Sequence, residues 1–247
     1  MRFKEDIFNS TNWIYNITES LIISLLDMNA KNKGSISSSV KEYWENLLSD
    51  GIKLLDLPNR ELTLSHSASK GSLLRTYFSS EVTSTIRSLV SSPENLEIFL
   101  ISSLTVLLHR YTNQNDIAFG LIINNNDQLG VNDNLSFFRN TIAPSFDFNT
   151  VYKSTENRVL LNFENYYPNN DFLNDFDLVH KNGQNSLLDV VLTINTLSAN
   201  NTENGDEGIV YVGEVSSDSN IKFILEIEES QIRFDVIYND DVFDRKL

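Results

Sequence analysis

The chain has 247 residues, of which 40% are hydrophobic and 21% are charged, and this composition excludes collagen-like and intrinsically disordered proteins. The formal net charge of −15 argues against nucleic acid and anionic lipid as partners, because an acidic surface repels both. The sequence has no cysteine, which excludes disulfides, thiolate nucleophiles and cysteine-ligated metals.

The N-terminal region, MRFKEDIFNSTNW, lacks the apolar core of a signal peptide. Apolar residues then recur at helical spacing and predict an amphipathic helix, through Trp13, Ile17, Leu21, Leu25 and Met28. A polar linker follows over 30–39, so we divide the chain into an N-terminal helix and linker, 1–39, and a domain, 40–247. No apolar run is long enough to cross a bilayer, and we therefore expect a cytoplasmic protein.

Helices and strands alternate through the first part of this domain. The apolar spacing and turn residues predict a helix over 40–48, an extended segment through Pro58, a strand over 73–78, and helices over 80–89 and 94–111. The helix over 94–111 is apolar around nearly its whole circumference, so we expect it to be deeply buried.

Strands dominate the second part of the domain. We expect a buried strand over 117–123, a polar loop over 124–134, an extended run over 137–148 and a helix over 151–166. Further strands are predicted over 187–194, 209–215, 221–229 and 232–239, with a flexible loop over 195–208. This order of elements predicts a mixed α/β fold.

The sequence offers few candidates for catalysis. Its three histidines, His66, His109 and His180, have no second histidine at metal-ligand spacing, and we interpret all of them as structural. His109 closes the helix over 94–111, where a basic residue is favourable near the last carbonyls. No nucleophile elbow or phosphate-binding glycine loop occurs, and the acidic run at Asp240, Asp241 and Asp244 lacks EF-hand spacing. We therefore assign no catalytic, cofactor-binding or metal-binding residue.

Several stretches, in the same order as in the family, resemble the condensation domains of nonribosomal peptide synthetases. These domains belong to the chloramphenicol-acetyltransferase-like superfamily. The matching stretches are YWENLLSDGIKLLDLP (43–58), LLHRYTNQNDIAFG (107–120), SFFRNTIAP (136–144), SLLDVVLTIN (186–195) and FDVIYNDDVFDR (234–245). The resemblance implies a single lobe of the chloramphenicol-acetyltransferase-like α/β fold, with a mixed β-sheet flanked by helices.

The resemblance also implies which parts are missing from this sequence. Condensation domains have two lobes, and their catalytic His-His-x-x-x-Asp-Gly motif ends the first lobe, whereas this sequence has no adjacent histidine pair. It therefore resembles the second, C-terminal lobe. The lobe departs from the family pattern at three positions: Asn126 stands at an expected arginine, Ser145 where an arginine often follows, and Arg139 at an apolar position.

Function is left open between different classes. The chain is expected to be a non-catalytic docking module for synthetase domains, namely an adenylation domain, another condensation lobe or a carrier protein. The alternatives are one lobe of a split enzyme that forms amide bonds with a His-bearing lobe, a piece of a longer synthetase, and an unrelated α/β protein. We expect no cofactor on the chain itself, although a carrier partner would bear phosphopantetheine. A homodimer that covers the exposed face of a lone lobe is a further expectation.

Overall fold

The computed structural model describes residues 37–57, 70–90, 92–125, 136–167, 175–176, 190–196, 210–216, 219–228, 231–240 and 242–243. The N-terminal helix predicted over 13–28 lies outside these residues, as do His66, Asn126 and His180. No helix of the described part is both long and apolar enough to span a membrane.

Each described helix begins after a polar N-cap residue. The helices are α2 (Ser38–Leu48), α3 (Ser80–Leu89), α4 (Pro93–Thr112) and α5 (Phe148–Glu164). Their caps, whose side chains accept a hydrogen bond from a backbone N–H of the first turn, are Ser37, Ser79, Ser92 and Asp147. A cap of this kind satisfies one of the free N–H groups of the first turn and so determines where the helix starts.

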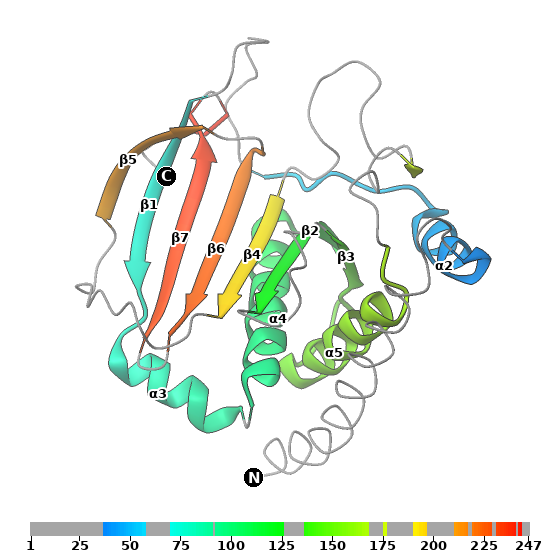
Figure 1. Ribbon diagram of the computed structural model, residues 1–247, viewed down its shortest axis with the longest axis horizontal. Helices are drawn as coiled ribbons and strands as arrows, with labels where there is room; N and C mark the ends of the chain where they lie inside the picture. The colour runs from blue at the N-terminus through cyan, green and yellow to red at the C-terminus, as the bar shows by residue number, and fades with distance from the viewer. Residues whose placement is uncertain are drawn as a thin grey trace.

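The described strands form one seven-stranded sheet in the order β3-β2-β4-β6-β7-β1-β5 (Figure 1). Their bounds are β1 (Lys70–Tyr77), β2 (Asp116–Asn125), β3 (Ser136–Thr141), β4 (Val190–Thr196), β5 (Val210–Ser216), β6 (Ile221–Ile227) and β7 (Ile232–Asn239). The central strands β2, β4 and β6 run parallel, and the pairs on either side of them are antiparallel. The predicted mixed sheet flanked by helices is therefore confirmed.

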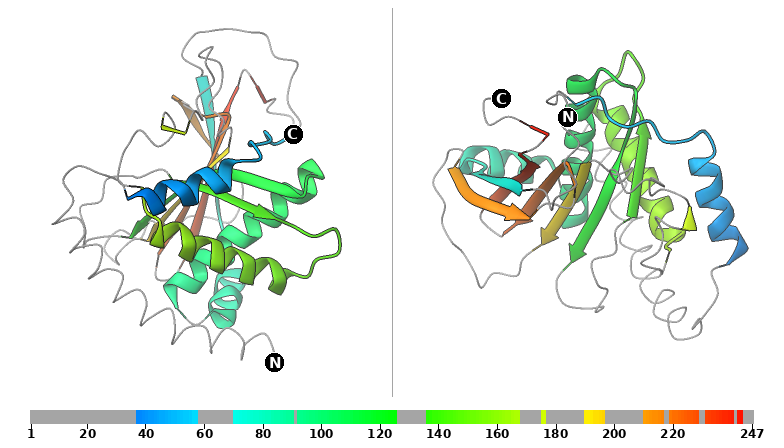
Figure 2. Two further views of the ribbon diagram at one scale, coloured as in Figure 1. Left: turned by 90° about the vertical axis from the view of Figure 1, so that its right-hand side faces the viewer. Right: turned by 90° about the horizontal axis from the view of Figure 1, so that it is seen from above.

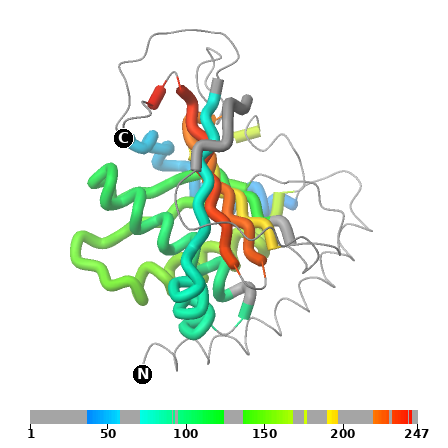
Figure 3. Tube along the Cα trace, turned by 90° about the vertical axis from the view of Figure 1, so that its left-hand side faces the viewer, coloured from blue at the N-terminus to red at the C-terminus, as the bar shows by residue number. Residues whose placement is uncertain are grey.

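Two helices cover one face of this sheet. Figure 3 shows the sheet nearly edge-on, with α4 and α5 together on one side of it. The main core forms between α4 and this face, from residues that include Leu100, Ile101, Leu104, Phe119, Leu192, Ile194 and Leu225. The helix α2 lies apart from this layer, beyond the β3 edge (Figure 2), where buried Trp44 packs with Phe137.

Two expectations about the helices need correction. The extended run predicted over 137–148 ends at Thr141, and α5 begins at Phe148, earlier than the predicted residue 151. The reason is Asp147, whose carboxylate accepts hydrogen bonds from both the backbone N and the Oγ1 of Thr150 and so starts the helix. The helix α4 is buried over most of its length, as expected, but Leu107 is 42% exposed and Tyr111 is 68% exposed near its C-terminal end.

Candidate functional site

His109 lies in the last turn of α4 and binds the turn that follows the helix. Its Nδ1 lies 2.7 Å from the carbonyl oxygen of Gln114, and a carbonyl can only accept, so this nitrogen donates. The ring also meets Phe146 edge-on, with centroids 5.2 Å apart. Asn113 follows with φ 55°, a left-handed C-cap conformation, and its N–H donates to the His109 carbonyl at 2.8 Å. The imidazole is therefore held within the turn that joins α4 to β2.

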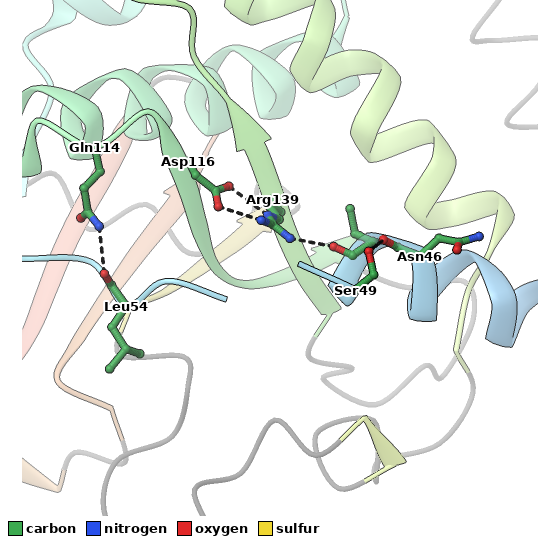
Figure 4. Close-up of polar contacts among 7 residues, drawn as sticks. Asn46, Ser49, Leu54, Gln114, Asp116 and Arg139 are labelled. Carbon is green, nitrogen blue, oxygen red and sulfur yellow. Dashed lines mark hydrogen bonds and ion pairs between the residues drawn. The ribbon is translucent and has the colours of Figure 1, made fainter. Parts of the chain in front are cut away.

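The side chain of Gln114 fastens a distant segment to this turn. Its Oε1 accepts from the backbone N of Asp56 at 2.8 Å, and its Nε2 donates to the carbonyl of Leu54 at 3.0 Å (Figure 4). The Gln114 amide thus makes two hydrogen bonds to the backbone of this segment, as a neighbouring β-strand would. The partners are about sixty residues earlier in the chain, and sequence reasoning missed this contact because no local pattern indicates it.

The arginine that stands at an apolar position of the family pattern is fully engaged. Arg139 donates through Nε and Nη2 to both carboxylate oxygens of Asp116, at 2.9 and 2.8 Å. Its remaining nitrogen, Nη1, donates to the carbonyl of Leu47 at 2.8 Å. The hydrogen bonds that Arg139 donates to Asp116 raise its pKa above the ordinary value, so the guanidinium stays charged. This residue joins β2, β3 and the last turn of α2.

The aromatic pair of α2 anchors that helix to α5. Trp44 is 1% exposed and donates through Nε1 to the carbonyl of Asn165 at 2.8 Å. Tyr43 donates through its hydroxyl to Oδ1 of Asn162 at 2.7 Å, and Asn162 donates through Nδ2 to the Phe137 carbonyl at 2.9 Å. Burial raises the pKa of Tyr43, so its hydroxyl keeps its proton for this bond.

A second charged group lies in the middle of the sheet and is named here the ionic ladder: Arg75, Asp235, Arg233 and Glu226. Arg75 donates to both oxygens of Asp235, at 2.8 and 2.7 Å, and Nη2 of Arg233 lies 2.5 Å from Glu226. Nε of Arg233 is 3.4 Å from Asp235, which links the two pairs. In the strand register Arg75 is opposite Asp235 and Glu226 is opposite Arg233, so the four groups share one face of β1, β7 and β6. Two cations and two anions therefore balance each other within the sheet.

The remaining residues named from the sequence lie in different places. Asp240 accepts hydrogen bonds from the hydroxyl of Ser72 at 2.7 and 2.9 Å, while Asp241 and Asp244 lie outside the described residues. Ser145 is exposed in the turn before α5. Within the part of the chain that the structure describes, no group of three or more His, Asp or Glu side chains could hold a metal ion.

The polar contacts at these sites join separate helices and strands to one another. Asp116 is paired with Arg139, and the four ladder residues are paired with each other, so none of these charges is paired with a histidine. The sequence analysis identified Arg139 as a departure from the family pattern but did not predict its partner Asp116. It did not predict the ionic ladder. The only signal for the ladder was the placement of Arg233 and Asp235 at alternate positions of an otherwise apolar strand, which puts both on one face.

Comparison with known proteins assigns the family. Residues 30–247 match the family model of the condensation domain, and the chain therefore belongs to the condensation-domain family. Bacitracin synthase 1 of Bacillus licheniformis is 25% identical over 224 residues, a match that covers 87% of this chain and 4% of that protein. The chain thus spans a small part of the length of this relative.

Solved structures show the same fold at low sequence identity. The X-domain in its complex with OxyB from teicoplanin biosynthesis has a TM-score of 0.65 and 15% identity, over 90% of this chain and 51% of that chain. The starter condensation domain of rhizomide synthetase RzmA has a TM-score of 0.57 and 13% identity, over 91% of this chain and 51% of that chain. The described fold therefore corresponds to about half of these structures, which agrees with one lobe.

Proposed function

We propose that this chain acts as a non-catalytic docking module in a nonribosomal peptide synthetase system. One observation carries the proposal: the chain aligns with about half of condensation-domain structures, and its sequence contains no adjacent histidine pair. The half of the scaffold that is present keeps its sheet, core and interlocking polar contacts. The group expected to assist acyl transfer is not in this sequence.

The chemistry of acyl transfer supports this reading. Attack of an amine on a thioester needs a group that removes or positions a proton near neutral pH, and histidine is the usual choice. Here the Nδ1 of His109 is bound to the Gln114 carbonyl. The carboxylates of Asp116 and Asp235 are each bound by an arginine. Each of these groups is therefore already engaged by a neighbour within the fold.

A relative with the same fold supports a role in protein contacts. The X-domain structure is a complex with a second protein, OxyB. For the present chain we propose synthetase domains as the partners, either an adenylation domain or another condensation lobe. A carrier protein is a further candidate, although carriers are usually acidic and the charge of −15 opposes simple attraction.

The test is co-purification of the tagged chain from the organism that makes it, followed by mass spectrometry of the bound proteins. We expect synthetase domains among them, at levels well above those recovered with an unrelated tagged acidic protein. The purified chain should form no amide product from aminoacyl-carrier substrates. Recovery of no synthetase component would contradict the docking role, and amide formation by the chain alone would contradict the non-catalytic one.

A split condensation enzyme is the second candidate, and the same half-length alignment favours it. In that case a separate lobe would supply the histidine pair and this chain would complete the substrate channel. Mixing the chain with a His-bearing first lobe should then yield amide product that neither component forms alone. The matched control carries alanine at the second histidine of that lobe. Activity of the mixture, lost in this control, would replace the docking proposal with the split enzyme.

A further inference from the structure

The outer side of α4 near its C-terminal end presents a row of exposed and partly exposed residues. Ser103, Leu107 and Tyr111 follow each other at intervals of four and form one ridge, with Arg110 beside it; we name these four residues the outer α4 ridge. Leu107 is 42% exposed and Tyr111 is 68% exposed, although the helix packs its other side against the sheet. The burial predicted for this apolar helix is therefore incomplete at Leu107 and Tyr111 of this ridge.

The charge of the ridge differs from that of the rest of the protein. The chain has 34 acidic residues, yet none occurs between Ile98 and Asn115. Arg110 is exposed and forms no ion pair with any residue that the structure describes. The ridge thus combines apolar area with one cation that has no ion-pair partner among the described residues, on a protein whose net charge is −15.

We propose that the outer α4 ridge docks an acidic amphipathic helix of a partner protein, a proposal that rests on the docking function above. A straight row of side chains at four-residue spacing is the surface against which another helix packs its own ridges. Leu107 and Tyr111 supply the apolar contact, and tyrosine and arginine are enriched among the residues that dominate protein interfaces.

The acidic character of the partner helix follows from the charges. Arg110 requires a carboxylate if it is to be covered without leaving a buried charge unpaired. An acidic partner would be repelled by most of this protein's surface, but not by a ridge that has no carboxylate. The same charge pattern therefore both selects the partner and restricts the orientation in which it binds.

The experiment places a photoreactive benzophenone side chain at Tyr111 of the full chain, Tyr111→p-benzoylphenylalanine, in the organism that makes it. A matched control places the same group at Val82 of α3, which is 46% exposed and belongs to the helix preceding the opposite end of α4. We expect irradiation to join position 111, but not position 82, to a partner peptide that sequencing identifies as amphipathic, helical and rich in Asp or Glu. A cross-link to a basic or non-helical peptide, to a second copy of this chain, or equally from both positions would overturn the proposal, as would no cross-link.

Two substitutions at Arg110 complete the test and leave the fold intact, because the side chain is exposed. Arg110→Glu should weaken binding of the identified partner about tenfold, and Arg110→Lys should retain most of it. Equal binding by both variants would overturn the role of charge. If synthetase domains still co-purify with the chain after Arg110→Glu and Leu107→Ser, the docking function stands and the ridge is not its surface. If none co-purifies with the unaltered chain, the docking function itself fails.

Discussion

Two charged regions on the same face of the sheet are satisfied in different ways. Both regions lie on one face because a row of cross-strand partners connects them from β3 to β7: Phe137, Gly120, Val191, Lys222 and Ile237. At one edge, Arg139 binds Asp116 of the neighbouring strand and also the Leu47 carbonyl of α2, so it fastens a separate helix. In the middle, the ion pairs of the ionic ladder join β1, β7 and β6 to one another. Similar ion pairs therefore serve assembly at the edge and charge balance in the middle.

The largest effect is expected from breaking the ladder at its most buried member. The Asp235 side chain is 4% exposed, and Asp235→Ala leaves Arg75 and Arg233 without their shared carboxylate. We expect the free energy of unfolding in urea to fall by about 3 kcal/mol. Replacing the pair together, Arg75→Met with Asp235→Leu, should restore most of it. A loss below about 1 kcal/mol in the single variant would show that the ladder is not effectively buried.

A smaller and more local effect is expected at the edge. Arg139→Met removes the contact with Leu47 and leaves Asp116 unpaired, and we expect a loss of about 2 kcal/mol because both side chains are partly exposed. Hydrogen exchange should accelerate selectively in α2, which loses a fastening, and not in β6 or β7. Asp235→Ala is the control, since it should leave the exchange of α2 unchanged. Uniform acceleration in both variants would erase the distinction between the two regions.

The amide of Gln114 gives a weaker fastening at the same edge. Gln114→Ala removes the bonds to Leu54 and Asp56, both of which are exposed enough for water to replace them. We expect a loss of about 1 kcal/mol. Limited proteolysis should cut faster within residues 51–57. Gln114→Glu keeps the acceptor for the Asp56 N–H and loses the donor to Leu54. Its cleavage rate should therefore lie between the rates of the unaltered chain and of Gln114→Ala. A rate equal to that of the unaltered chain would contradict the double contact.

The smallest effect concerns pH and lies away from both regions. Hydrogen bonds from Thr150 lower the pKa of Asp147, the exposed N-cap of α5. Because the pKa in the folded state is below the ordinary value, its contribution to stability is present above about pH 4 and is lost as the pH falls through the lowered pKa. Asp147→Ser keeps a cap that does not titrate, and thermal unfolding of this variant should depend less on pH below pH 4. An unchanged dependence would exclude Asp147 as a contributor.

The sequence predicted the elements better than the contacts between them. α3 and α4 start within one residue of their predicted bounds, because the cap Ser79 and the N-terminal Pro93 act within one turn. The start of α5 was missed because the capping role of Asp147 was not recognised in a run that read as extended. The partner of Arg75 was not predictable, since Asp235 lies 160 residues later and no local pattern joins them. The same applies to Gln114 and the segment that it holds.

The position of β6 and β7 in the sheet has a consequence for synthesis of the protein. These two strands stand between β4 and β1, so they connect the β3-β2-β4 group to the β1-β5 pair. At about 5–20 residues per second, the ribosome takes roughly ten to thirty seconds to extend the chain from Arg75 to Asp235, 160 residues later. Throughout that interval β1 has no route into the central sheet. The nascent polypeptide must therefore keep β1 from associating with other chains until the β6–β7 hairpin has been synthesised.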